Sequence, residues 1–504
     1  GKYRAQATAG PTPKGVIYTV APSPLDVKRI WAGTDDGLIH LTIDGGQHWS
    51  DVTPPAISAW QKISLMDAGH FDAATAYAAV NTLRLDELHP HIFRTHDNGK
   101  TWQEIVRGIP DGETVNVVRE DPQRKGMLFA GTERAVYLSD DDGENWRPLR
   151  LNMPATSVRD LIVKGDDVAV ATHGRGFWIL DNITCLRQHN SGNHEDILFK
   201  PQAAMRVRFS MNTDTPLPPD EPAGENPPDG AMIDYYLAAN ATGEVTLEIK
   251  DAKGELVRHY SSTDAAPPPD PRLNIPTYWV RPFQALSSQA GLHRFLWDLH
   301  YTPVAGIDAE YPMTAVYAQT APAATSPWAM PGEYSVTLTA NGQSRIQPLT
   351  LAMDPRVHAT AADLEEQFQA LRKLSGLRPD LEKLNRHLDP LMAEIRQAQE
   401  RAGEKAVAKS LQALVKKLQD FAGTNPQRPG TPLELDVLQK AKDLFSRVEK
   451  ADAAPTANAL SAINEVAEKA KSIGQEWKTI ESQDLPALNR ELEAAGLGQI
   501  EIQK

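Results

Sequence analysis

Charged and imidazole side chains in the first third of the chain could carry chemistry, because they fall in short polar segments between apolar ones. They are Asp35, Asp36, Arg84, Asp86, His89, His91, Glu133, Arg134, His173 and Arg175. A glycosidase needs two carboxyl groups held ~5–10 Å apart in a cleft. Asp35 or Asp36 with Glu133 are the candidates for that pair, whereas the arginines and histidines suit the binding of a ligand without any reaction.

Other kinds of site receive less support from the spacing of these residues. Asp86, His89 and His91 are of types that bind zinc, but their spacing is unspecific, so we expect no metal. The segment His173-Gly174-Arg175-Gly176 does not lead from a strand into a helix, as a phosphate-binding loop does. No cofactor is therefore expected. The simplest alternative is that all these residues are solvated and form ion pairs within their turns.

A turn motif that occurs three times indicates which elements hold these residues. Its pattern is Thr/Ser-x-Asp-x-Gly-x-x-Trp, and the copies are Thr42, Asp44, Gly46, Trp49; Thr95, Asp97, Gly99, Trp102; and Ser139, Asp141, Gly143, Trp146. The copies are roughly 45–55 residues apart, a period typical of repeat folds. The Asp carboxylate can accept N–H bonds within its own turn, the Gly allows a positive φ, and the Trp is expected to be largely buried. We interpret the motif as structural rather than catalytic or calcium-binding.

Residues 15–185 have the pattern of short β-strands, because apolar runs such as VIYTV and MLFAG alternate with Gly, Asp and Pro turns. A strand, a turn and a strand recur at residues 32–42, 130–139 and 171–180. Each repeat is therefore expected to be a four-stranded blade of a β-propeller. Since strand direction alternates, the turn between the second and third strands should lie opposite the repeated motif. That face would collect the candidate side chains, several of them from an insertion at residues 81–91.

Two further segments follow the propeller repeats, which we place in residues 1–185. Residues 186–230 are expected to be a connector, because the run TDTPLPPDEPAGENPPDG is too rich in proline for a central strand. Residues 231–354 alternate apolar and polar side chains, with DAKG and ANGQ as hairpin turns, and this pattern predicts a compact β-sandwich.

The last segment, residues 355–504, has the pattern of an antiparallel helical bundle. Its apolar side chains recur in steps of three and four, and they include Leu381, Leu384, Leu388, Leu391, Ile395, Val466, Ala470, Ile473, Trp477 and Ile480. Capping boxes at Thr360-x-x-Asp363 and Thr431-Pro432-x-Glu434 predict where two of the helices begin.

Composition and charge narrow the possible partners. The formal net charge of −14 and the pI near 5.5 argue against a nucleic-acid backbone or an anionic membrane as the main partner. A single cysteine, Cys185, excludes an internal disulfide and a cysteine-rich zinc site. No apolar run approaches the ~18–20 residues of a membrane-spanning helix, so no membrane span is expected.

The repeated turn motif resembles the Asp-box, or bacterial neuraminidase repeat, found in the propellers of sialidases, xyloglucan-cleaving glycosidases and sortilin receptors. The longer runs IWAGTDDGLIHLTIDGGQHW, VREDPQRKGMLFAGTERAVYLSDDDGENW and VATHGRGFWILDN are similar to large exported bacterial proteins described as sortilin-like or glycosyl-hydrolase-like repeat proteins. The runs GLHRFLWDL and PGEYSVTL resemble an Ig-like domain that follows the propeller in such proteins. The resemblance implies a secreted, periplasmic or cell-surface protein. It also implies that a ligand would bind on the face away from the Asp-boxes.

These observations predict a mainly β chain with an all-α C-terminal part. Its parts would be a partial Asp-box β-propeller, an Ig-like β-sandwich and an antiparallel helical bundle. Since propellers have about 4–8 blades, we expect the N-terminal portion of the same precursor to supply further blades. The expected function is that of a binding or scaffold protein that recognises a peptide or a glycan, not nucleic acid. The alternative is a sialidase-like or xyloglucanase-like glycoside hydrolase whose active site is completed by the missing blades.

Overall fold

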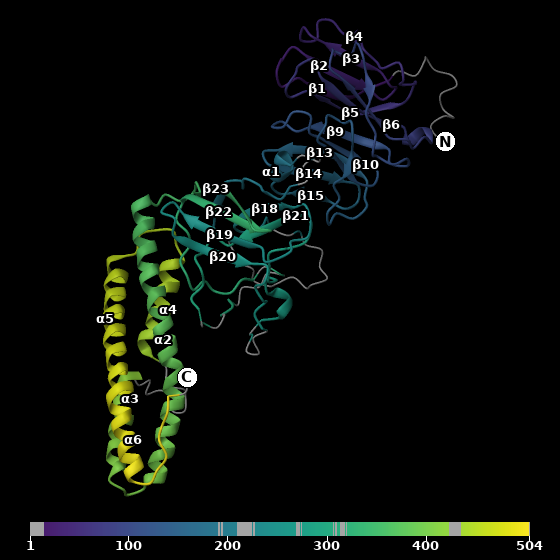
Figure 1. Cartoon of the computed structure of the whole chain (residues 1–504). Helices are drawn as coiled ribbons and strands as arrows, with labels where there is room; N and C mark the ends of the chain where they lie inside the picture. The colour runs from purple at the N-terminus through teal and green to yellow at the C-terminus, as the bar shows by residue number, and fades with distance from the viewer. Residues whose placement is uncertain are drawn as a thin grey trace. The chain divides into compact units, whose positions relative to one another are not determined.

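Figure 1 shows a computed structural model of the chain, in which strands make up the first part and long helices the last. The structure describes residues 15–189, 192, 195–208, 224, 227–268, 273, 275–305, 307, 310–312, 318, 320–422 and 435–502. The chain divides into two compact units, residues 1–195 and 196–504. Each unit is described by itself below.

Four antiparallel sheets, here called blades 1 to 4, make up the N-terminal unit. Blade 1 has β1 (Ile17–Pro22), β2 (Ile30–Thr34), β3 (Ile39–Thr42) and β4 (Ser50–Asp51); blade 2 has β5 (Lys62–Ala68), β6 (Ala76–Asn81), β7 (His91–Thr95) and β8 (Gln103–Glu104); blade 3 has β9 (Val115–Glu120), β10 (Leu128–Thr132), β11 (Val136–Ser139) and β12 (Arg147–Pro148); and blade 4 has β13 (Val158–Lys164), β14 (Asp167–Thr172) and β15 (Phe177–Leu180). Within each blade every strand pairs with the next one along the chain.

The blades pack face to face in chain order, with the first strand of each blade against the blade before it. Glycines in the second strands allow the close approach. A Cβ on Gly33 would lie 2.5 Å from Cγ2 of Ile63 in the next blade, and a Cβ on Gly131 would lie 2.5 Å from Cγ1 of Val158. Apolar clusters fill the contacts between blades 1 and 2 and between blades 2 and 3. The N-terminal unit therefore has a β-propeller-like fold.

The three turns with the Thr/Ser-x-Asp-x-Gly-x-x-Trp motif, here called the Asp-box turns after the motif they resemble, have one hydrogen-bond pattern. In each turn an Asp oxygen accepts the backbone N–H four residues on, at 3.0 Å for Asp44, 2.9 Å for Asp97 and 2.9 Å for Asp141. The motif Thr or Ser hydroxyl oxygen accepts the N–H of the motif Gly in every copy. The Thr101 backbone N–H, together with the Thr101 and Thr95 hydroxyls, lowers the pKa of Asp97 to about 2. The carboxylates thus hold their own turns together.

The tryptophans of the motif differ from the prediction that all three are buried. Trp146 is 5% exposed and its Nε1–H donates to the Ile105 carbonyl at 2.8 Å, while Trp102 donates to the Val52 carbonyl at 2.7 Å. Trp49 is 45% exposed. The prediction is wrong for Trp49 because each partner carbonyl belongs to the preceding blade, and no sheet precedes blade 1 among residues 15–189.

Two sheets open the C-terminal unit and share one apolar core. The three-stranded sheet has β16 (Ile197–Leu198), β18 (Ala231–Leu237) and β21 (Gly291–Trp297); the five-stranded sheet has β17 (Ala204–Arg206), β23 (Gln343–Met353), β22 (Gly332–Ala340), β19 (Thr246–Asp251) and β20 (Leu256–Ser261). The predicted DAKG and ANGQ turns join β19 to β20 and β22 to β23. Most of the connector run at residues 213–230 lies outside the described residues.

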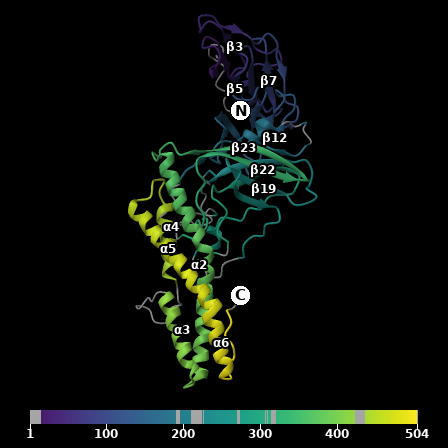
Figure 2. The same ribbon diagram turned by 60° about the vertical axis from the view of Figure 1, so that its left-hand side comes forward.

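The helical region follows these sheets, and its helices bury a common core. The helices are α2 (Ala361–Ala402), α3 (Val407–Ala422), α4 (Asp436–Glu449), α5 (Ala457–Thr479) and α6 (Leu485–Ala494), with a π-helical turn, η4 (Ile480–Asp484), before the last. Figures 1 and 2 show α4 and α5 along one half of α2, and α3 and α6 together near its other end. The capping box at Thr360 is present, whereas Thr431, Pro432 and Glu434 lie outside the described residues.

Two arginines join the helical region to the five-stranded sheet. Arg206 of β17 is buried and donates to Asp452 at 2.5 Å, and Arg208 donates to the same carboxylate at 2.8 Å. Both guanidinium groups lie over the Trp328 ring, 5.1 and 4.9 Å from its centre. Gln367 of α2 completes the joint by accepting a bond from Arg206. In the described part of the chain no helix is both long and apolar enough to cross a membrane.

Candidate functional site

The turns between second and third strands lie on one face of the N-terminal unit, which we call the turn face. The Asp-box turns lie on the other face, because strand direction alternates in each blade. Asp35 and Asp36 follow β2, Glu133 and Arg134 follow β10, and His173 and Arg175 follow β14; the insertion in blade 2, with the 3-10 turn η2 (Leu83–Leu85), supplies Arg84, Asp86, His89 and His91. The turn face therefore carries all the candidate ligand-binding residues named from the sequence.

Arginine–carboxylate pairs on the turn face connect neighbouring blades. Arg84 of blade 2 lies 3.6 Å from the Asp35 carboxylate of blade 1 and also donates to the Asp35 carbonyl. Arg159 of blade 4 donates to Glu133 of blade 3 at 3.0 Å, and a second nitrogen of the same guanidinium lies 3.3 Å from Nδ1 of His173. Asp35 and Glu133 are thus brought into contact with arginines.

The histidines of the insertion are engaged by separate carboxylates. Nδ1 of His89 lies 2.6 Å from Asp111, while the His91 ring lies between Glu104 at 2.6 Å and Glu87 at 2.9 Å. Asp86 is exposed, in a left-handed backbone conformation at φ 62°. Among the described residues no group of three or more His, Cys, Asp or Glu side chains has the arrangement of a metal site.

An aromatic side chain that the sequence analysis missed lies on the turn face. Trp60 precedes β5, has φ 69° and is 38% exposed. A left-handed backbone is rare for so bulky a residue and costs of order 1–3 kcal/mol unless the surroundings impose it. Here its backbone N–H donates to the Asp36 carbonyl at 2.7 Å, which holds the Trp60 backbone against the Asp36 turn. The feature that distinguishes Trp60 is its positive φ, and no sequence pattern predicts that.

The turn face also has exposed apolar and basic groups. Leu38, Leu83 and Leu88 project from the same turns with large exposed fractions, and Arg134 and Arg175 are exposed as well. Apolar surface interspersed with charged groups of both signs suits a ligand that combines apolar faces with hydrogen-bonding groups.

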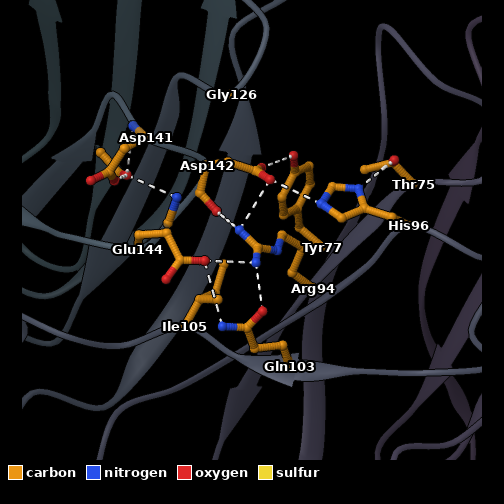
Figure 3. Close-up of polar contacts among 12 residues, drawn as sticks. Thr75, Tyr77, Arg94, His96, Gln103, Ile105, Gly126, Asp141, Asp142 and Glu144 are labelled. Atoms are coloured by element: carbon orange, nitrogen blue, oxygen red, sulfur yellow. Dashed lines mark hydrogen bonds and ion pairs between the residues drawn. The ribbon is translucent and has the colours of Figure 1, made fainter. Parts of the chain in front are cut away.

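A second set of residues, not predicted from the sequence, bridges blades 2 and 3 on the Asp-box face (Figure 3). The Asp142 carboxylate accepts the Tyr77 hydroxyl at 2.7 Å and a guanidinium N–H of buried Arg94 at 3.0 Å, and it lies 2.9 Å from Nε2 of His96. Arg94 also donates to Glu144 at 2.8 Å. Asp142 occupies a variable position of the Asp-box, so the motif itself gave no signal for it.

A cavity of about 220 Å³ adjoins this network. Its lining is rich in carboxylates and aromatic rings, namely Phe71, Asp72, Thr75, Tyr77, His96, Glu120, Lys125, Gly126, Asp140, Asp141 and Asp142. Burial raises the pKa of Glu120, although its oxygens accept the backbone N–H groups of His70 and Gly126. Burial also raises the pKa of the neighbouring Asp67, which accepts the Glu120 N–H at 2.8 Å.

Comparisons with known proteins find only weak structural likenesses. No model of a known protein family matches the chain, and no curated protein matches it. Among solved structures it is similar to YCF48 bound to D1 peptide, with 17% identity over 33% of this chain and a TM-score of 0.27. YCF48 from Cyanidioschyzon merolae (18% identity, 34% of this chain, TM-score 0.26) and the GH74 enzyme of Niastella koreensis (14%, 35%, 0.27) are similar to the same extent.

The chain spans about half the length of the YCF48 structures, 52% and 55%, and 24% of the GH74 enzyme. Likenesses of this size carry no argument about function.

Proposed function

We propose that this chain is part of a β-propeller binding or scaffold protein that recognises a peptide or a glycan on the turn face. In this proposal the two sheets of the C-terminal unit form an Ig-like sandwich, and the helices form a bundle that acts as a spacer. An exported or cell-surface location accompanies the proposal, because it rests on the same resemblance to exported repeat proteins.

The observation that carries the proposal is Trp60. An exposed indole held in a constrained backbone offers a flat apolar surface at low entropic cost, and such rings bind sugar faces and peptide side chains. The Asp36 turn fixes its position through the 2.7 Å hydrogen bond to the Trp60 N–H. The Arg84–Asp35 pair next to that turn adds donors and acceptors for hydrogen bonds.

The carboxylates of the turn face favour binding over hydrolysis. A glycosidase needs one carboxyl group that can donate a proton and a second that faces it. Asp35 lies against Arg84, and Glu133 accepts bonds from Arg159 and from Asn116, the latter at 3.0 Å. Asp36, the other candidate, accepts the Thr34 hydroxyl within its own turn at 2.5 Å. Each candidate acid therefore already has a hydrogen-bond donor or a guanidinium group beside it.

One observation favours the alternative, a sialidase-like or xyloglucanase-like glycoside hydrolase. In the cavity between blades 2 and 3, burial raises the pKa of the Glu120 carboxyl group. Asp72 and Asp142 line the same cavity. A raised pKa is the property of a general acid. Hydrolysis of xyloglucan oligosaccharides or sialyl aryl glycosides by the full chain, abolished in Glu120→Gln, would establish this alternative.

The proposed binding is tested by probing printed arrays of glycans and peptides with the purified full chain. We expect Trp60→Ala to weaken binding to the best-bound member at least tenfold, since truncating a tryptophan at the centre of a binding surface typically costs about 2 kcal/mol or more. Trp49→Ala is the matched control, because Trp49 is exposed to a similar degree on the Asp-box face. Equal binding by Trp60→Ala and wild-type protein would refute the proposed site.

A further inference from the structure

The first strand of blade 1 is exposed at positions that are buried in every other blade. The pairing of first with second strands aligns Ile17 with Ile63, Val115 and Val158, and Val20 with Met66, Val118 and Leu161. The aligned residues of blades 2 to 4 are at most 1% exposed, whereas Ile17 is 66% exposed and Val20 57%. In blades 2 to 4 this side of the first strand packs against the preceding blade. We call Ile17, Val20 and Trp49 the front face of blade 1.

Blade 4 exposes apolar residues on its opposite side, which in blades 1 to 3 faces the following blade. Phe177 of β15 aligns with Ile39, Ile92 and Val136, which are at most 3% exposed, yet Phe177 is 83% exposed. Ile179, two residues further along the strand, is 63% exposed. In blades 1 to 3 the aligned positions face the following blade. We call Ile162, Phe177 and Ile179 the rear face of blade 4.

Trp49 shows what kind of surface is missing at the front face. Trp102 and Trp146 donate to the carbonyls of Val52 and Ile105, and each of these residues directly follows the fourth strand of the preceding blade. The same aliphatic side chains contact the glycines of the next Asp-box. A Cβ on Gly99 would lie 2.7 Å from Val52, and one on Gly143 would lie 2.3 Å from Ile105.

Gly46 occupies the same position of the first Asp-box. A Cβ on Gly46 would have a single neighbour within 4 Å, Nε1 of Trp49 at 3.9 Å. A complementary surface must therefore offer a fourth strand, an aliphatic residue after it and a carbonyl that can accept the Trp49 N–H.

We infer that the front and rear faces are docking surfaces for further four-stranded blades of the same repeat, which the described residues do not contain. Burying exposed aliphatic and aromatic side chains at ~25 cal/mol per Å² gives such a contact its driving force. Docking of further blades does not depend on the ligand of the turn face.

A second copy of this chain does not provide the surface that the front face requires. Blade 4 has three strands in the described part of the chain, so its rear face lacks the fourth strand and the carbonyl that follows it. The partner of the front face is therefore a complete blade. Leu149, which follows the fourth strand of blade 3, has the chemistry required, because its N–H donates to Val136 just as that of Val52 donates to Ile39.

The experiment adds such a blade to the full chain. Residues 1–16 are replaced by a second copy of residues 115–157, which comprises blade 3 and its natural linker, so that Ile17 takes the place of Val158. We expect amide hydrogen exchange in β1 to slow at least tenfold and acrylamide quenching of Trp49 fluorescence, obtained by difference from Trp49→Phe, to fall. Val20→Asp should remove this protection from the extended chain while leaving the original chain unchanged.

Two results would overturn the inference. An extended chain with unprotected β1 amides and a quenchable Trp49 would show that a complete blade does not dock on the front face. Sedimentation of the original chain as a stable dimer with protected β1 amides would show that a second copy covers it instead.

Discussion

Trp146 and Trp49 occupy the same position of the Asp-box but should differ widely in their contribution to stability. Trp146→Phe removes the Nε1–H that donates to the Ile105 carbonyl at 2.8 Å inside a buried contact. An unpaired buried carbonyl costs about 1–3 kcal/mol, and the smaller ring leaves part of the site unfilled. We expect Trp146→Phe to lower the free energy of unfolding by about 2–4 kcal/mol.

Trp49→Phe changes a side chain that is 45% exposed. Substitutions at such positions usually fall within about 0.5 kcal/mol of wild type. Urea unfolding of the full chain, followed by circular dichroism in the β-sheet region, measures both variants, and an unchanged m-value shows that the same surface unfolds in each. Equal decreases in the free energy of unfolding for Trp49→Phe and Trp146→Phe would refute the conclusion that the tryptophan of the motif stabilises the contact with the preceding blade.

Three further outcomes are expected. Asp97→Asn should make melting less sensitive to acid, because the folded pKa of about 2 lies below the usual 3.8 and the stabilisation by the carboxylate is lost as pH falls between those values. Glu120→Gln should gain in melting temperature relative to wild type as pH rises above about 4.5, because a folded pKa raised by burial makes the wild type lose stability on ionisation. Arg206→Met should lower the free energy of unfolding of the C-terminal unit by about 1.5–3 kcal/mol, since Asp452 loses a charged hydrogen-bond donor but keeps Arg208 as a partner, and calorimetry measures that change.

The local features of the fold were predictable where they depend on neighbouring residues. The hydrogen bonds of the Asp44, Asp97 and Asp141 turns span four residues, and the Thr360 capping box spans three, so the sequence contains every partner. The prediction of a mainly β chain with a helical C-terminal part is confirmed for the same reason, because strand and helix periods are local.

The candidate site was less predictable because its contacts are distant in sequence. Arg84 meets Asp35 across 49 residues, and Tyr77 meets Asp142 across 65. Which charges pair depends on how neighbouring blades are aligned, and a single sequence does not give that alignment. The backbone of Trp60 is set by a carbonyl 24 residues away, so its unusual φ left no local signal.

The joint between the five-stranded sheet and the helical region has a consequence for motion. Arg206 and Arg208 share the Asp452 carboxylate and both lie over the Trp328 ring, so a hinge at this point would have to separate two ion pairs and two cation–π contacts at once. The sheet and the helices should therefore tumble in solution as one body. Their backbone amides would share a single rotational correlation time, and a torque applied to the helices would turn the sheet with them.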